Sequence, residues 1–248
     1  MRMKEDHMLN GQLKPGYNIQ VGTENFFVIG YDVFPNPTDT RTFPLHLDNV
    51  MQRLGCKFKT AIADAGYGSE ENYDYLEERK ITGAVKYTSY EKETKRSFKK
   101  KIFNFENWNY DAGQKEYTCP CGNPVPYKKT VTKKKGSGYM QTYEVYQCDN
   151  CEGCPYRDLC TKSGYGRTVQ RNEHWLEQKA KVKELLATDE YKKLMKERSI
   201  ECETVFGQIK GNQNFRRFHL RGKEKVGTEW GLLMLGYNFK QIARLMKV

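Results

Sequence analysis

Hydrophobic and polar positions in the first third of the chain predict a hairpin followed by a helix. Two apolar runs at 17–22 and 26–31 flank the polar residues Thr-Glu-Asn, which predicts a β-hairpin over residues 17–34. Apolar side chains then recur at helical spacing, so residues 43–54 predict an amphipathic helix that ends at Gly55. The members of this apolar stripe are Leu47, Val50, Met51 and Leu54.

The next segment predicts a strand, a helix and a second strand. A short apolar run, residues 60–63, ends at Asp64 and reads as a strand with a carboxylate at its tip. Ser69 precedes Glu70 and Glu71, which predicts a helix over 69–80 with Ser69 as its N-cap. Residues 81–87 predict the second strand. A mixed α/β class follows from this succession.

The pattern changes at residue 88. From there to about 172 helical periodicity is absent, and lysine runs, turn residues and six of the eight cysteines occur. Helical character returns at 173, and residues 228–247 are apolar almost all round, which predicts a buried helix. We therefore predict three segments: an N-terminal part at 1–87, a Lys/Cys-rich insertion at 88–172 and a helical part at 173–248.

Charge and composition narrow the class of protein. The net charge of +11 and the pI of about 9.1 favour a polyanionic partner, and nucleic acid is the commonest. The first residues lack the apolar core of a signal peptide, and the longest apolar run, 231–236, is too short to span a bilayer. We expect a cytoplasmic protein without a membrane partner, whose cysteines are thiols or metal ligands.

Two carboxylates are the candidate chemistry. Asp64 lies at a strand tip and Glu203 lies in a helical stretch, where it shares a stripe with Gly207 and Lys210 at about 100° per residue. Glu201 faces nearly the opposite side. Carboxylates on separate rigid elements of a basic chain indicate divalent-metal phosphoryl chemistry on nucleic acid. The spacing alone leaves open an ordinary surface helix with Glu and Lys on its wet face.

Three blocks, in this order, carry a resemblance to a known family. They resemble the C-terminal part of bacterial insertion-sequence transposases of the DDE type. The blocks are Gly16-Tyr-Asn-Ile-Gln20, Ala63-Asp-Ala-Gly-Tyr-Gly-Ser-Glu-Glu-Asn72, and Glu203-Thr-Val-Phe-Gly-Gln-Ile-Lys210 followed by Phe215-Arg-Arg-Phe-His-Leu-Arg-Gly222. The resemblance implies an α/β fold: an RNase H-like mixed sheet with helices, interrupted by the cysteine-rich insertion. It also implies an enzyme that uses Mg²⁺ or Mn²⁺ to cleave DNA at insertion-sequence ends and to transfer the strands to target DNA. The protein would be associated with the nucleoid, and the resemblance leaves open whether it forms a homodimer.

The resemblance also assigns roles. Asp64 matches the family's second catalytic Asp, Glu203 its Glu, and Lys210 a lysine that contacts the transposon end. The first catalytic Asp would precede the Gly16 block, where only fifteen residues are present and read as a polar loop. We therefore expect a chain that lacks the first catalytic strand and is inactive alone, with Asp32 as the one substitute considered. The alternative is a non-catalytic, zinc-stapled DNA-binding remnant or inhibitor.

Six cysteines have zinc-ligand spacing. Cys119-Pro-Cys121 is followed by C-x2-C-x2-C-x5-C from residue 148 to residue 160, in a segment with few apolar residues that would need a staple to fold. Reduced thiols in a poorly ordered insertion are the alternative. Cys56 and Cys202 lie in apolar patterns and read as core thiols. The resemblance favours a structural zinc on Cys119, Cys151, Cys154 and Cys160, with Cys121 and Cys148 as alternates.

Basic residues form three clusters. The two lysine clusters, at 92–101 and 128–135, read as solvated loops or as loops presented to DNA. The third follows the Glu203 helix and alternates with Phe215, Phe218 and His219, which favours contact with DNA phosphates. From this cluster we predict the DNA-binding residues Arg216, Arg217 and Arg221, together with Lys210.

Overall fold

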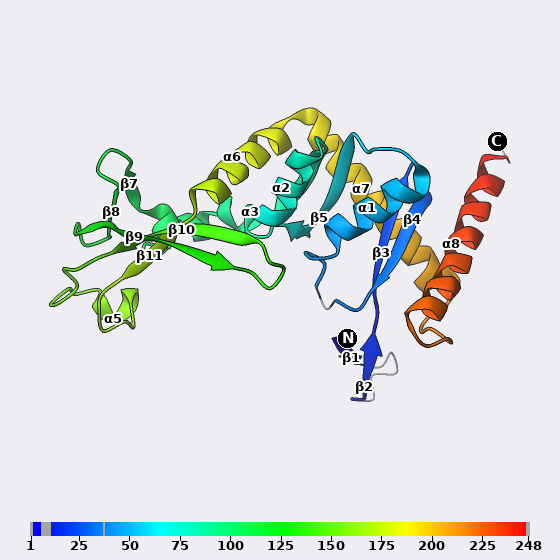
Figure 1. Ribbon diagram of the computed structural model, residues 1–248, viewed down its shortest axis with the longest axis horizontal. Helices are drawn as coiled ribbons and strands as arrows, with labels where there is room; N and C mark the ends of the chain where they lie inside the picture. The colour runs from blue at the N-terminus through cyan, green and yellow to red at the C-terminus, as the bar shows by residue number, and fades with distance from the viewer. Residues whose placement is uncertain (1, 6–10, 37, 247–248) are drawn as a thin grey trace. The chain divides into compact units, whose positions relative to one another are not determined.

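The computed structural model describes residues 2–5, 11–36 and 38–246 (Figure 1). The described part is mixed α/β, with several sheets and eight α-helices, which confirms the predicted class at this level. The chain divides into two compact units: a first unit of residues 1–87 and 182–248, and a second unit of residues 88–181. The predicted three-part organisation, with the insertion ending at 172, stays a prediction. Helix α6, Glu173–Ala187, crosses the later boundary.

The strands of the first unit pair two by two within the described residues. β3 (Asn18–Glu24) and β4 (Phe27–Phe34) form an antiparallel hairpin, which confirms the hairpin predicted over 17–34. β5 (Thr60–Gly68) and β6 (Thr82–Tyr87) pair in parallel. These pairs remain separate two-stranded sheets, so the RNase H-like sheet that the resemblance implies stays a prediction.

The region before Gly16 differs from the predicted polar loop. β1 (Arg2–Glu5) and β2 (Leu13–Gly16) pair antiparallel, with Arg2 opposite Gly16. Backbone hydrogen bonding holds an extended conformation here without an apolar pattern in the sequence, which is why periodicity missed it. Residues 6–10 of the predicted loop lie outside the described residues.

Two helices of the first unit form where the sequence predicts them, although α2 ends before the predicted residue 80. α1 spans Phe43–Leu54 and ends at Gly55, whose φ of 65° is left-handed. α2 spans Glu70–Glu78, and the Ser69 side chain accepts a hydrogen bond from the backbone N–H of Asn72, which confirms the N-cap. α2 connects the parallel strands β5 and β6, as a crossover in a βαβ unit must.

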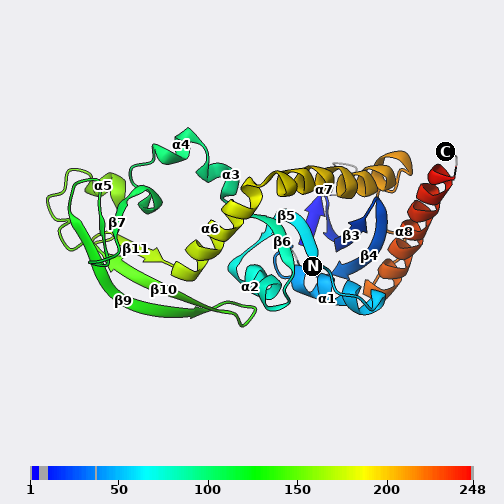
Figure 2. The same ribbon diagram turned by 90° about the horizontal axis from the view of Figure 1, so that it is seen from above.

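The core of the first unit lies between the β3–β4 hairpin and the two C-terminal helices (Figure 2). α7 spans Asp189–Gly207 and α8 spans Lys223–Leu245. No helix in the described part of the chain is long and apolar enough to cross a bilayer. The fully packed members of this core are Val28, Val205, Ile209, Trp230, Met234 and Tyr237.

The prediction that residues 228–247 form a fully buried helix is wrong for one face. Trp230 and Met234 are buried, yet Leu232, Leu235 and Phe239 are more than half exposed. α8 packs against β4 along a single stripe, so only the side chains of that stripe are buried. The close approach requires a glycine, because a Cβ at Gly231 would lie 2.1 Å from the Tyr31 hydroxyl oxygen.

The second unit is an antiparallel sheet in the order β11–β10–β9–β8–β7. Its core is built from aromatic and valine side chains, including Trp108, Tyr117 and Tyr146, together with Cys148 and Cys151. The sequence shows few apolar residues in any one stretch here, but these aromatics come from distant positions and meet in the sheet. This unit's need for a metal staple stays a prediction. Its elements are α3 (Tyr90–Glu93), α4 (Arg96–Lys99), the 3₁₀ turn η1 (Phe105–Asn107), β7 (Asn109–Asp111), β8 (Glu116–Thr118), β9 (Pro124–Lys134), β10 (Met140–Gln147), α5 (Arg157–Cys160) and β11 (Thr168–Arg171).

Candidate active site

Asp64 lies where strand β5 separates from its neighbour. The ladder with β6 runs from Thr60 to Ala63 and resumes only at Gly68. Asp64 is exposed in this gap, and its Oδ1 accepts the backbone N–H of Ala65 at 2.7 Å. The strand thus continues beyond the predicted end at Asp64. At Gly68 the backbone of β5 again approaches that of β6 closely. A Cβ at this position would lie 2.2 Å from the Lys86 carbonyl oxygen, so only glycine fits.

Tyr67 is the side chain around which several elements of the first unit meet. Its hydroxyl donates to Oε1 of Gln20 on β3, and its ring lies 5.2 Å from that of Phe43 on α1. Burial raises the pKa of the Tyr67 hydroxyl, and the charge of Asp39 adds to the rise, with smaller contributions from Asp64 and Cys202. Helix α7, which carries Cys202, packs against β5 and β3.

Glu203 lies on the exposed side of α7, next in sequence to Cys202. Cys202 touches Thr23 of β3, with 3.5 Å between Sγ and Oγ1, and Val205 is fully buried in the core. Glu203 itself is exposed. Glu201, two residues earlier, is half-buried. The two glutamates thus lie on different sides of the helix, as the periodicity predicts.

Lys210 does not continue a regular α-helical stripe from Glu203. The helix widens into η2, a π-helical turn at Gln208–Asn212, closed by the N–H of Gln213 on the carbonyl of Gln208 at 2.9 Å. A π-turn rotates each residue by less than 100°, so the predicted alignment of Glu203, Gly207 and Lys210 is altered. Lys210 is exposed, and its Nζ lies 5.2 Å from the centre of the Phe206 ring.

Asp32 is not available as a metal ligand. It is buried at 8% exposure and accepts hydrogen bonds from three side chains of α1: His46 Nδ1 at 2.7 Å, Asn49 Nδ2 at 3.1 Å and Arg53 at 2.5 Å. Burial raises the pKa of Asp32, but its hydrogen bonds to His46 and Arg53 and their charges outweigh this and hold the pKa below its ordinary value. This carboxylate fastens β4 to α1.

The predicted DNA-binding arginines lie on a loop with an aromatic inner side. Phe215 and Phe218 pack on each other and on Trp230, with ring centres 5.2–6.1 Å apart. Glu229 accepts the backbone N–H groups of His219 and Leu220 and so fixes the loop against α8. The exposed side of this loop, here called the arginine loop, carries Arg216, Arg217 and Arg221.

The six clustered cysteines line one small cavity of about 20 Å³ in the second unit. The four predicted zinc ligands and both alternates are among its lining residues. The Sγ atoms of Cys121 and Cys154 are 3.1 Å apart. Burial raises the pKa of Cys148 to about 12, and the hydrogen bond with Cys154 raises that of Cys121 to about 11. In the described residues no three His, Cys, Asp or Glu side chains are arranged to hold a metal ion.

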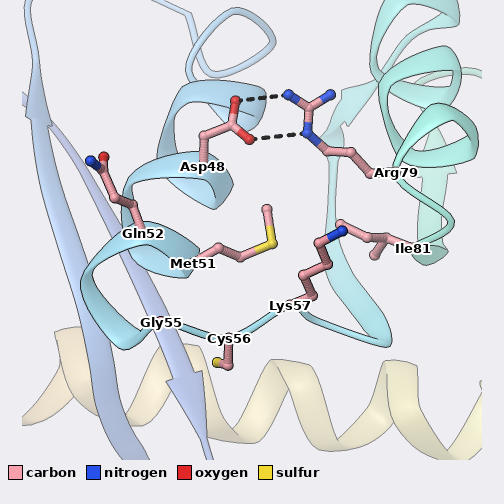
Figure 3. Close-up of a pocket in the computed structure, with 8 residues that line it drawn as sticks. All are labelled: Asp48, Met51, Gln52, Gly55, Cys56, Lys57, Arg79 and Ile81. Atoms are coloured by element: carbon pink, nitrogen blue, oxygen red, sulfur yellow. Dashed lines mark hydrogen bonds and ion pairs between the residues drawn. The ribbon is translucent and has the colours of Figure 1, made fainter.

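A cavity of about 460 Å³ lies away from the carboxylates, at the amino end of β5 (Figure 3). Asp48 of α1 and Arg79 form a two-pronged ion pair across it, with Arg79 Nε 3.0 Å from Asp48 Oδ1. Cys56 lines it and is exposed, so its prediction as a core thiol is wrong, because α1 ends at Leu54 and Gly55 turns the chain outward. This cavity contains none of the predicted site residues.

Sequence reasoning missed the polar residues that are hydrogen-bonded to Tyr67 and to one another. Gln20 is buried, and its Nε2 donates to Oδ1 of Asp39 at 3.2 Å as well as to Asn18 at 2.7 Å. Asp39 lies in the connection between β4 and α1. Gln20 and Tyr67 both fall within the blocks that carry the family resemblance, and that placement is the signal that could have identified them.

Comparison with protein families gives one match. A family described as "Transposase DDE domain" matches residues 118–243, just over half of the 248 residues. The matched segment contains the six clustered cysteines, Glu203, Lys210 and the arginine loop, whereas Asp64 precedes it. No curated protein and no solved structure matches the chain. On the family match, the chain belongs to the DDE transposase domain family.

Proposed function

We propose that the chain is the catalytic part of an insertion-sequence transposase that cleaves DNA and transfers strands with the help of divalent metal. The observation that carries the proposal is that α7, which carries Glu203, packs against β5, which carries Asp64, and against β3, where Cys202 contacts Thr23. This packing supports a site to which both carboxylates contribute. An RNase H-like core is part of this proposal.

Asp64 and Glu203 are suited to hold Mg²⁺ or Mn²⁺. Both side chains are exposed, and carboxylate oxygens are the ligands that Mg²⁺ prefers. A bound divalent ion supplies activation of an attacking oxygen and stabilisation of the leaving oxygen at phosphorus. In this proposal Lys210 and the arginine loop hold DNA phosphates, which positions the strand without reading its bases.

Metal-dependent cleavage of a duplex that carries an insertion-sequence end tests the proposal. Because we expect the chain to be inactive alone, Mn²⁺ binding measured by calorimetry is the first readout. We expect Asp64→Ala and Glu203→Ala each to weaken this binding and to abolish any cleavage that the wild-type chain shows. Glu201→Ala is the matched control, since it removes a carboxylate from the other side of the same helix, and it should keep both. Cleavage that survives Asp64→Ala sinks the assignment.

One result would favour the alternative function. A wild-type chain that binds DNA but neither cleaves it nor binds Mn²⁺ would be a non-catalytic, zinc-stapled DNA-binding protein. It would act as a remnant or as an inhibitor that competes for ends or for other transposase subunits. DNA binding is common to both functions, so the metal readouts decide between them.

We also propose one structural zinc ion in the second unit, held by Cys119, Cys151, Cys154 and Cys160, with Cys121 and Cys148 as alternates. The support is the convergence of all six thiols on a cavity with room for about one small species. With Zn–S bonds of about 2.3 Å, two thiolates on one zinc lie roughly 3.8 Å apart. The 3.1 Å separation of Cys121 and Cys154 is shorter, so metal binding requires side-chain rotations.

Elemental analysis of the purified chain tests this site. We expect about one zinc per chain, lost in Cys151→Ser and retained in Cys56→Ser, whose exposed thiol lies in the first unit. A folded wild-type chain without metal would refute the site.

A further inference from the structure

The hairpin of β9 and β10 extends beyond the sheet to which it belongs. β8 pairs with β9 only at Pro124–Pro126, and β11 pairs with β10 only at Glu144–Gln147. The outer part of this hairpin, residues 128–143, is here called the ribbon (green β9 and β10 in Figures 1 and 2). At its base, residues 128–130, β10 still pairs with β11 on its other side, and from 131 to 143 only β9 and β10 pair among the described strands. Within the described residues β9 has no strand neighbour other than β10 from residue 128 on.

The ribbon is strongly and uniformly basic. It contains five lysines and neither Asp nor Glu. The acidic residue at its base, Glu144, is already compensated, because Lys115 Nζ lies 3.2 Å from its Oε1 and the Tyr146 hydroxyl donates to its Oε2 at 2.6 Å. The lysines of the ribbon are Lys128, Lys129, Lys133, Lys134 and Lys135.

The contacts of these lysines leave their charge available. Lys128 donates to the neutral amide of Gln147 at 2.8 Å, and Lys133 donates to that of Gln170 at 2.7 Å. Lys133 also lies over the Tyr143 ring and Lys135 over the Tyr139 ring, with 5.1 and 5.6 Å between Nζ and ring centre. Such contacts orient a lysine without neutralising it.

The charges lie on both faces of the ribbon. Successive side chains on a strand point to opposite faces, so Lys129 and Lys133 share one face and Lys134 lies on the other. A flat polyanionic surface would leave one of these faces unused. The major groove of DNA admits a two-stranded ribbon and has phosphates along both walls, so it uses both faces.

We propose that residues 128–143 form a DNA-binding arm that enters the major groove of a duplex and contacts phosphates on both sides. It is a contact in the second unit, in addition to the arginine loop of the first. The choice of DNA as the polyanion rests on the proposed function. The contacts are with the backbone, so binding through the arm is expected on any duplex sequence.

Fluorescence anisotropy of the full chain on a short duplex of arbitrary sequence, without added divalent metal and without chelator, tests the arm. We expect Lys129→Gln/Lys134→Gln, one lysine from each face, to weaken binding about ten-fold and to reduce the slope of log K against log salt by about 2. The charge-keeping Lys129→Arg/Lys134→Arg should bind like wild type. Both side chains are exposed, so the fold should be unaffected.

The matched control removes the same charge elsewhere. Lys59→Gln/Lys162→Gln changes two exposed lysines outside the three basic clusters, and we expect it to leave the salt slope unchanged. If both double variants lost the same affinity for the duplex, the effect would be one of net charge and the proposed arm would be wrong. Wild-type affinity in Lys129→Gln/Lys134→Gln would also contradict the arm. Tighter binding to single-stranded RNA that depends on the same lysines would overturn duplex DNA as the partner. Failure of the proposed function would appear instead in the cleavage assay with Asp64→Ala.

Discussion

At the scale of single residues, two aspartates of the same unit have opposite environments. Asp64 is exposed at a gap in a strand ladder, and Asp32 is buried with three donors from one helix. Only the exposed carboxylate can exchange partners for a metal ion. The buried carboxylate of Asp32 is needed by the fold, because its removal would leave the charged donors on α1 without their partner.

Asp32→Asn should lower the free energy of unfolding by about 2 kcal/mol at neutral pH, since it removes the charge that His46 and Arg53 hold. The folded-state pKa of Asp32 is depressed, so this stability is present above the unfolded pKa of about 3.9 and is lost as pH falls through the folded pKa. Urea unfolding at neutral and at acidic pH should show the difference narrowing in acid. Asp149→Asn, at an exposed site, should show no such difference, and equal stability of Asp32→Asn and wild type at neutral pH would contradict the role.

At the scale of elements, α8 shows how packing divides a helix that is apolar all round. Its buried stripe, with Trp230 and Met234, faces β4 and α7, and the opposite stripe is exposed. Burial therefore depends on which stripe meets a neighbour, and the hydrophobicity of the segment alone does not decide it. The π-helical turn after α7 is a second element-scale feature, since it redirects the chain between Glu203 and the arginine loop.

Two truncations on α8 measure this division. Met234→Ala, at 3% exposure, should destabilise the chain by about 2–4 kcal/mol, because it leaves a cavity in the core. Leu232→Ala, at 65% exposure, should change stability by less than about 0.5 kcal/mol. Urea unfolding of the two variants beside wild type is the measurement. Similar losses in both would mean that the outer stripe of α8 is covered in solution.

At the scale of the whole molecule, the chain has two compact units with separate cores. One core joins the β3–β4 hairpin to α7 and α8, and the other is the aromatic cluster around Trp108 and Tyr146. The proposed chemistry of the carboxylates belongs to the first unit, and the cysteine cavity and the proposed DNA arm belong to the second. Separate cores allow one unit to lose order while the other keeps it.

Removal of zinc should therefore act on one unit only. We expect a strong chelator to increase amide hydrogen exchange around residues 119–160, because the thiols converge there, while β3, β4 and α8 keep their protection. Hydrogen exchange followed by mass spectrometry resolves the two regions. Cys151→Ser should reproduce the effect without chelator. Unchanged exchange at 119–160 in both experiments would count against a metal-stapled second unit.

The sequence by itself determined the local elements of this protein. The hairpin over 17–34, the helix at 43–54 and the Ser69 cap follow from periodicity, turn residues and capping, which act between neighbours in the chain. It also supplied Asp64 and Glu203 as candidates, through their place in the motif blocks. These are interactions that a short stretch of chain can specify alone.

Only the tertiary structure decided what depends on contacts between distant residues. It set which stripe of α8 is buried, which α1 side chains hold Asp32, and that Cys56 is exposed. It placed Tyr67 against Gln20 of β3 and Phe43 of α1, and it left β9 beyond Pro126 with β10 as its one strand neighbour in the described residues. Burial and electrostatic environment are properties of the packed chain, because each is set by side chains that the sequence places far apart.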